Sequence, residues 1–223
     1  MRALTLGVVI LLLLVVILWH HESDHINYWL NCKFKNGVNM SGVPTPKTIR
    51  MRVNQLVDGL PAPAAGPSDP WYTFVDFGCG AGDIVATVKS SDSLDSVLGV
   101  ELDAEQAART RARFAGEPNV QIITQNMTDF EFPDVPLVLY LYEPLWCLPA
   151  EEALPIYRRV LENLTESVKK GLRPVDVYII YVSGVRPMLN VEFFTGYGAQ
   201  LVHESRARRG LGWAGNKIWM FQL

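Results

Sequence analysis

Residues 74–82 read FVDFGCGAG, a short apolar strand pattern that runs into three glycines at alternate positions. A helical pattern follows at residues 83–89, so the chain must turn sharply at the carboxyl end of a strand. Glycine permits left-handed backbone and lets a ligand approach bare backbone. Asp76 places a carboxylate just before the turn, which suits a cationic or amino group better than a phosphate. The stretch therefore predicts a ligand-binding strand–turn–helix unit.

The glycine spacing limits the kind of ligand. Gly78, Gly80 and Gly82 follow the pattern G-x-G-x-G, whereas the dinucleotide fingerprint is G-x-G-x-x-G and binds a pyrophosphate at the helix start. The spacing favours a ligand other than NAD, and a nicotinamide-dependent oxidoreductase stays as a lesser alternative. The chain contains no P-loop and no nucleophile elbow.

Strand and helix patterns alternate on both sides of this unit. Apolar runs predict strands at 73–77, 97–101, 120–124, 137–142 and 175–182, and helical spacing predicts helices at 83–89, 104–114 and 151–170. Residues 187–197 are helical or irregular, and two final strands at 199–204 and 217–223 have no helix between them. The sequence predicts an α/β fold with a doubly wound, seven-stranded, mostly parallel sheet whose last two strands form a hairpin.

The segment from Asp76 to Gly82 resembles the first motif of class I S-adenosylmethionine-dependent methyltransferases, which have a Rossmann-like fold. The resemblance implies that the turn, including Cys79, wraps the methionine part of S-adenosylmethionine and that Asp76 orients it. It also implies that Glu101, which closes the second strand 19 residues after Gly82, binds both ribose hydroxyls. Leu102 follows as a further cofactor-binding residue. Asp103 begins a helix and is expected to be its N-cap.

The resemblance extends to the segment after the third strand, which should contact the adenine. Asn126 stands where the family commonly has an acid, and its side-chain oxygen can accept from the adenine amino group. Met127 is expected near the ring through its backbone amide. Asp129 is the alternative acid, with a loop-capping role equally open.

The fourth strand ends in residues 140–146, YLYEPLW, at the edge that borders the methyl group in this family. Glu143 departs from the Asp or Asn usual before the proline, and a carboxylate there can orient or deprotonate an amine. Tyr142 and Trp146 can wall the pocket or hold a cationic nitrogen, or they are core aromatics. The expected function is methyl transfer from S-adenosylmethionine to an amine of a protein side chain or to a small molecule. Because Asn126 and Glu143 depart from the family pattern, an inactive membrane-bound binding module stays open.

The amino-terminal part differs from the rest of the chain. Residues 3–19 carry no charged residue. This run is at the short end of the lengths that span a membrane as a helix. We expect a transmembrane anchor at 1–20, a connecting region at 21–70 that contains a helix, and a cofactor-binding domain at 71–223. The cofactor-binding domain is expected on the cytosolic side of the membrane. A cleaved signal peptide is the alternative. Residues 43–46, VPTP, resemble the lead-in of small lysine methyltransferases with a hydrophobic amino-terminal segment, in which this element covers the cofactor.

The net charge and the cysteine content limit the classes of partner and metal site that are expected. The chain of 223 residues has 20 Lys and Arg against 23 Asp and Glu, a formal net charge of -3 that gives no electrostatic footprint for nucleic acid. Three cysteines and four histidines form no disulfide framework and no metal-ligand pattern, so no metal site is expected. Arg206, Arg208 and Arg209 are expected in the loop of the last hairpin, either solvated or in contact with an acidic partner.

Overall fold

The structure is a computed structural model that describes residues 45–63, 71–145, 148–171, 176–183, 188–207 and 216–223. The uncharged run at 3–19, the beginning of the 43–46 lead-in, Trp146, Arg208 and Arg209 lie outside the described residues. Residues 41–223 make one compact unit. Within the described part, no helix combines the length and apolar character needed to cross a membrane.

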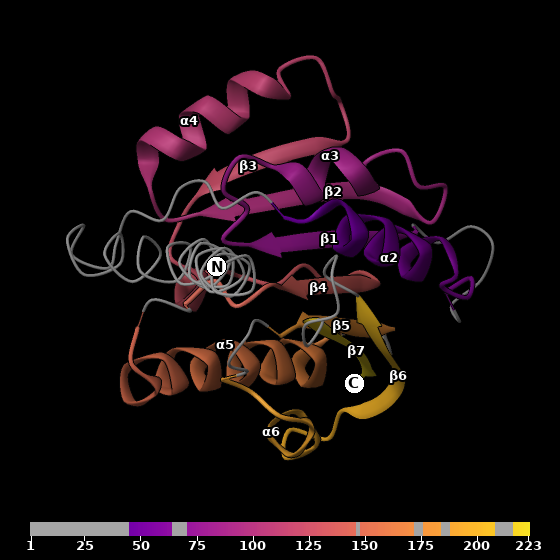
Figure 1. The fold of residues 1–223 in the computed structure, drawn as a ribbon, viewed down its shortest axis with the longest axis vertical. Helices are drawn as coiled ribbons and strands as arrows, with labels where there is room; N and C mark the ends of the chain where they lie inside the picture. Colours follow the sequence, from indigo (N-terminus) through magenta and orange to yellow (C-terminus); the bar gives the residue numbers. More distant parts are fainter. Residues whose placement is uncertain (1–44, 64–70, 146–147, 172–175, 184–187, 208–215) are drawn as a thin grey trace, which may run out of the picture. The chain divides into compact units, whose positions relative to one another are not determined.

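The unit is built on a seven-stranded sheet in the order β3-β2-β1-β4-β5-β7-β6 (Figure 1). The strands are β1 (Tyr72–Phe77), β2 (Leu94–Glu101), β3 (Val120–Thr124), β4 (Leu137–Leu141), β5 (Val177–Val182), β6 (Gln200–Ala207) and β7 (Asn216–Gln222). Strands β1 to β5 are parallel, and β7 is antiparallel to both of its neighbours. The prediction of a seven-stranded, mostly parallel sheet with a final hairpin is confirmed.

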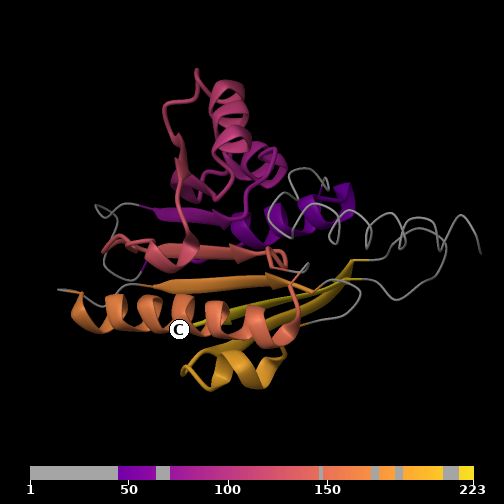
Figure 2. The same ribbon diagram turned by 90° about the vertical axis from the view of Figure 1, so that its left-hand side faces the viewer.

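Helices cover both faces of the sheet. One hydrophobic cluster joins the sheet to α2 (Lys47–Asp58), α3 (Asp83–Val88) and α4 (Ala104–Arg113). A second cluster joins the other face to α5 (Ala150–Lys170) and α6 (Val191–Thr195). Figure 2 shows α5 and α6 together on the side away from α2, α3 and α4. Every residue of β1, β4 and β5 is buried, as expected for central parallel strands covered on both faces.

Several element boundaries differ from the predicted ones, for local reasons. Strand β2 begins at Leu94 instead of Val97, because Leu94 pairs with Tyr72 and Ser96 with Thr73 of β1, although these residues are not a continuous apolar run. The helix expected within residues 21–70 is α2, which ends at Asp58 with Gly59 as its C-cap. Arg206 was expected in the hairpin loop, but it lies in β6 opposite Lys217. An edge strand can continue through polar residues because one side of it faces solvent.

The register brings the ends of the parallel strands to one edge. Phe77 pairs with Val100 of β2 and with Leu141 of β4, and Leu141 pairs with Tyr181 of β5. The chain builds outward from β1 to β3 and then returns to place β4 on the other side of β1. The point where the strand order reverses is the usual place for a ligand in open α/β sheets, so the loops that follow β1 and β4 are the candidate site.

Candidate functional site

The glycine turn after β1 has left-handed backbone at all three glycines. The φ angles are +74° at Gly78, +50° at Gly80 and +77° at Gly82. The backbone N–H groups of Gly78 and Cys79 donate to the carbonyl oxygen of Val100 at 2.9 and 3.2 Å. The turn is therefore tied to the end of β2, which holds the loop open at the edge of the sheet.

Two of the glycines are also required by close packing. A Cβ on Gly78 would lie 2.8 Å from the Cβ of Pro144, and a Cβ on Gly82 would lie 2.6 Å from Cε2 of Phe114. By contrast, the nearest atom to a Cβ on Gly80 would be 3.9 Å away. Gly78 and Gly82 thus fix how β4 and α4 pack on the turn, while the space beside Gly80 is open to a ligand.

Glu101 is held in place by the backbone around it. Its Oε2 accepts from the N–H of Gly80 at 3.0 Å, and its Oε1 accepts from the N–H of Asp103 at 3.0 Å. Asp103 accepts from the N–H of Gln106 at 2.8 Å and is the N-cap of α4, as predicted. Each carboxylate oxygen accepts only one of these bonds and keeps a second lone pair. The two oxygens together can therefore accept from two hydroxyl donors.

Asp76 is a buried carboxyl group, 4% exposed. Burial, and secondarily the charge of Glu101, raise the pKa of Asp76 to about 8. Within the described residues, no donor lies at hydrogen-bond distance from this side chain. A buried carboxyl group without a partner is prepared to receive a cationic group, because the cation stabilises the charged form.

The remaining predicted cofactor residues have different surroundings. Cys79 is buried against the Gly99 backbone, with its Sγ 2.9 Å from where a Cβ on Gly99 would lie, so it can offer a ligand only its backbone. Leu102 is 58% exposed at the carboxyl end of β2, an apolar surface for a planar ring. Asn126 accepts from the N–H of Thr128 at 3.1 Å and caps the short 3-10 helix η1 (Met127–Asp129). Met127 is half-buried.

The loop after β4 carries the two residues predicted to act on an acceptor. Glu143 is 5% exposed and has a φ of +39°, left-handed backbone that a non-glycine residue rarely adopts. Its Oε1 accepts from the hydroxyl of Tyr181 at 2.9 Å and from the N–H of Met188 at 3.3 Å. The hydroxyl of Tyr142 accepts from Nδ2 of Asn216 at 3.4 Å. Glu143 and Tyr142 thus meet residues of β5 and β7 beside the glycine turn.

Sequence reasoning missed Tyr181, Asn216 and Ser183. Asn216 donates to the carbonyl oxygen of Ser183 at 2.6 Å, and the hydroxyl of Ser183 accepts from the N–H of Lys217 at 3.0 Å. The signal available in the sequence was position alone, since Tyr181 and Ser183 lie at the end of a predicted strand. The pairing with Glu143 depends on the sheet order, which that position does not reveal.

The comparisons with known proteins bear on this arrangement. The family described as "Methyltransferase domain" matches residues 74–170, the segment that contains the glycine turn, Glu101 and Glu143. This segment is a methyltransferase domain, and it has the fold of solved S-adenosylmethionine-dependent methyltransferases.

Solved structures share the fold of this methyltransferase domain at low sequence identity. The N-methyltransferase NodS from Bradyrhizobium japonicum, in complex with S-adenosyl-L-homocysteine, has a TM-score of 0.57 at 13% identity, covering 82% of this chain and 92% of its own. The magnesium protoporphyrin IX methyltransferase from Synechocystis, with bound S-adenosylmethionine, has a TM-score of 0.55 at 13% identity, covering 88% and 93%. A search of curated protein sequences finds no match.

The cofactor of the methyltransferase domain is S-adenosylmethionine, and the residues at the edge of the sheet fit its parts. The unpartnered carboxyl group of Asp76 suits the ammonium of the methionine part, and the open space at Gly80 admits its chain. The two lone pairs left on Glu101 suit the ribose hydroxyls, and the exposed Leu102 offers an apolar contact for the adenine.

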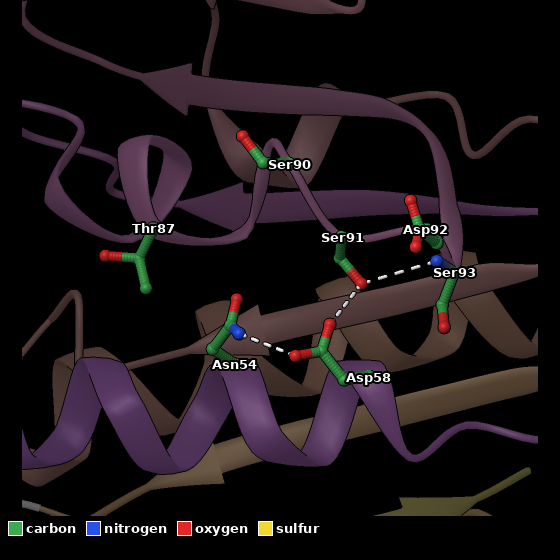
Figure 3. Close-up of a pocket in the computed structure, with 7 residues that line it drawn as sticks. All are labelled: Asn54, Asp58, Thr87, Ser90, Ser91, Asp92 and Ser93. Carbon is green, nitrogen blue, oxygen red and sulfur yellow. Dashed lines mark hydrogen bonds between the residues drawn. The ribbon is translucent and has the colours of Figure 1, made fainter.

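A separate hollow of about 290 Å³ lies on the α2–α3 side of the methyltransferase domain, away from this edge (Figure 3). Hydrogen bonds join several of its polar groups. Asn54 donates to Oδ2 of Asp58 at 2.7 Å, and the hydroxyl of Ser91 donates to Oδ1 of Asp58 at 2.6 Å. These bonds join the end of α2 to the segment before β2, so the hollow is a structural junction distant from the glycine turn.

Proposed function

We propose that this domain transfers the methyl group of S-adenosylmethionine to an amine, and that the amine belongs to a lysine side chain of a protein or to a small molecule. The observation that carries the proposal is the carboxylate of Glu143, placed beside the glycine turn by Pro144, which packs against Gly78. Tyr181 and Met188 both donate to Oε1, and these two hydrogen bonds fix the orientation of the Glu143 carboxyl group. A carboxyl group oriented in this way beside the glycine turn suits an amine acceptor.

In this proposal, Glu143 and Tyr142 have different roles towards the acceptor. Glu143 binds the acceptor nitrogen as an ammonium and then takes up its proton, which frees the lone pair for attack. Tyr142 lies half-buried next to Glu143 and offers a ring face to the cationic nitrogen. When bound, S-adenosylmethionine would supply both the methyl group and the sulfonium leaving group, and the residues of this chain would hold and deprotonate the acceptor nitrogen. The protein's main contribution is alignment of donor and acceptor.

The test is methyl transfer from labelled S-adenosylmethionine by the full chain, with lysine-containing peptides, small amines and an RNA offered as separate acceptors. The proposal expects label in an amine acceptor. Glu143→Gln should lower kcat about 100-fold or more, the scale of general-base catalysis, while the Kd of S-adenosylmethionine stays within about twofold. Transfer to RNA alone, or unchanged kcat in Glu143→Gln, would overturn the assignment.

Tyr181→Phe provides a matched positioning variant. It removes the hydroxyl that donates to Glu143 at 2.9 Å and keeps the ring, which stacks on Trp219 with centroids 5.7 Å apart. The expected result is a fall in kcat of about tenfold, the scale for losing one hydrogen bond to a charged group, with a shift in the pH profile of kcat. If stability falls but the pH profile does not move, Tyr181 supports the fold and not the acceptor site.

We further propose that residues 3–19 anchor the domain to a membrane with the domain in the cytosol. Support comes from the 17 consecutive uncharged residues and from the cytosolic supply of the cofactor. Alkaline extraction of membranes from cells that express the full chain is the test. The full chain should stay in the pellet, and a chain that starts at residue 21 should be released. Release of both would refute the anchor.

A further inference from the structure

Helix α2 lies outside the matched segment 74–170, and its direction places its first turn at the cofactor edge. Its last residue, Asp58, accepts from Ser91, which precedes β2, and Pro61 accepts from the hydroxyl of Tyr72, the first residue of β1. The end of α2 is therefore at the amino edge of the sheet. Its beginning points to the opposite edge, where the parallel strands end (Figure 2).

The contacts of Arg52 with β6 show where α2 lies along the direction of the strands. Its Nε donates to the hydroxyl of Ser205 at 3.2 Å, and its Nη2 lies 3.1 Å from Nε2 of His203. Through the strand pairing, His203 lies opposite Met220 of β7 and hence level with Ile180 of β5.

The same row of the sheet continues to the cofactor turn. Ile180 pairs with Tyr140 of β4, and Tyr140 pairs with Asp76 of β1. Arg52 thus lies level with Asp76. Arg50 precedes Arg52 by two residues, or about 3 Å along a helix axis, which is about one strand residue beyond Asp76 towards the glycine turn.

The side chains of Arg50 and Arg52 project from opposite sides of α2, because residues two positions apart in a helix differ by about 200° around its axis. Arg52 points to β6. Asn54 and Asp58 are one and two turns after Arg50 on its flank, and they face α3 and the segment after it (Figure 3). Arg50, one helical turn before Asn54, therefore faces the start of α3, where the glycine turn ends.

The guanidinium of Arg50 is half-buried there, and its Nε has no hydrogen-bond partner among the described residues, although it is shielded from solvent. A second donor in the same region is also unsatisfied. The hydroxyl of Tyr140 is fully buried on the α2 face without a partner, and its burial, followed by the charge of Asp76, raises its pKa. Buried donors without acceptors are costly, so an acceptor supplied by a ligand would stabilise this region.

We infer that Arg50 binds the carboxylate of the methionine part of the cofactor. This inference rests on the proposed cofactor geometry, in which Glu101 takes the ribose and Asp76 the ammonium. With those two contacts assigned, the α-carboxylate would need a separate donor, and Arg50 of α2 is a half-buried cation with an unsatisfied donor on this face of the sheet. The planar guanidinium offers parallel N–H donors that match a carboxylate. An ammonium at Asp76 and a carboxylate at Arg50 together neutralise both ends of the amino-acid group.

The experiment compares two ligands on the full chain by calorimetry. S-Adenosylhomocysteine carries the amino-acid group, and 5′-methylthioadenosine lacks it. Arg50→Met keeps the apolar stem of the side chain and removes the charge. The expected result is a loss of about tenfold or more in affinity for S-adenosylhomocysteine, with affinity for 5′-methylthioadenosine unchanged within about twofold. Arg52→Met makes the same chemical change on the other flank and should leave the ratio of the two affinities unchanged.

The outcomes separate the inference from the proposed function. An equal loss for both ligands in Arg50→Met, or no loss for either, overturns the role of Arg50 while wild-type binding leaves the cofactor assignment standing. If the wild-type chain binds neither ligand, the cofactor geometry fails and the inference fails with it. Partial recovery of S-adenosylhomocysteine affinity in Arg50→Lys would support a charge-based contact.

Discussion

Asp76 is a carboxyl group in a place that opposes its charge. It is buried at the end of a central strand, and the nearby Glu101 adds a second negative charge. Such a group weakens the empty fold at the pH where it ionises, and a cationic ligand removes that penalty. The cost of holding Asp76 in this position is therefore recovered when the ligand binds.

The first prediction concerns Asp76→Asn. The folded-state pKa of about 8 lies above the ordinary value of 3.8, so the folded protein holds this proton more tightly than the unfolded chain. The resulting stability is fully present below pH 3.8 and is lost as pH rises through about 8. The wild-type free energy of unfolding should fall relative to the variant by up to about 1.4 kcal/mol per pH unit in this window.

Urea unfolding of both proteins at several pH values between 5 and 9 measures this difference. The variant should be the more stable protein at pH 8.5 and should bind S-adenosylmethionine more weakly. Parallel stability curves would show that Asp76 does not hold its proton in the folded state.

The second prediction concerns Gly78→Ala. The substitution forces a Cβ onto left-handed backbone and to within 2.8 Å of Pro144, so it should cost about 1–3 kcal/mol of stability and weaken cofactor binding at least about tenfold. Gly116→Ala is the matched control, since a Cβ there meets nothing within 4 Å. Thermal unfolding and calorimetry measure both effects. Equal behaviour of the two variants would contradict the packing of Pro144 on the turn.

At the scale of elements, α4 is the support of the glycine turn. The hydroxyl of Thr110 donates to the carbonyl oxygen of Gly80 at 2.6 Å and accepts from Nε2 of Gln106 at 3.1 Å. Arg113 also donates to the carbonyl oxygen of Ala81. The side chains of one helix thus orient the carbonyl groups of the turn, and the N–H of Gly80 is left to face Glu101.

The third prediction tests this support. Thr110→Val keeps the shape of the side chain and leaves the Gly80 carbonyl without its donor, so it should cost about 1–2 kcal/mol of stability and several-fold in cofactor affinity. Thr165→Val is the control, because the Thr165 hydroxyl donates to Leu161 within α5, far along the chain from the turn. If both variants bind the cofactor equally well, α4 does not position the turn.

The elements were predictable from the sequence where a single local pattern decided them. The apolar run at 120–124 became β3 without change, and Asp103 was recognised as a cap by its place before a helical pattern. The pairing of Tyr181 with Glu143 was not predictable, since it joins residues 38 positions apart through the order of the strands. Likewise the left-handed backbone of Glu143 has no sequence signal, because the surrounding packing and not the residue type imposes it.

At the scale of the whole molecule, the matched segment 74–170 is only part of what the fold needs. Helix α2 places Ile49, Val53, Leu56 and Val57 in the cluster that covers one face of the sheet. Strands β5, β7 and β6 lie beyond the other end of the segment. The cofactor site and the acceptor site therefore depend on sequence outside the segment that identifies the family.

The fourth prediction follows from that dependence. A chain that starts at residue 41 should unfold cooperatively and bind S-adenosylmethionine, whereas a chain that starts at residue 60 exposes the apolar face that α2 covers. Burying four aliphatic side chains contributes about 1.5–3 kcal/mol each, which is comparable to the whole stability of a domain. The shorter chain should lack a sharp unfolding transition and should bind a hydrophobic dye. Equal cofactor affinity in both chains would show that α2 is dispensable.

Strand β7 lies between β5 and β6, although it follows both of them along the chain. On the ribosome, the free edge of β5 stays exposed until residues 216–222 have emerged, and Asn216 cannot reach Ser183 or Tyr142 before then. The glycine turn and its neighbours β2 and β4 are synthesised well before this point, and domains fold as their chain becomes available. A nascent chain can therefore assemble its cofactor half first, and the acceptor half is completed last.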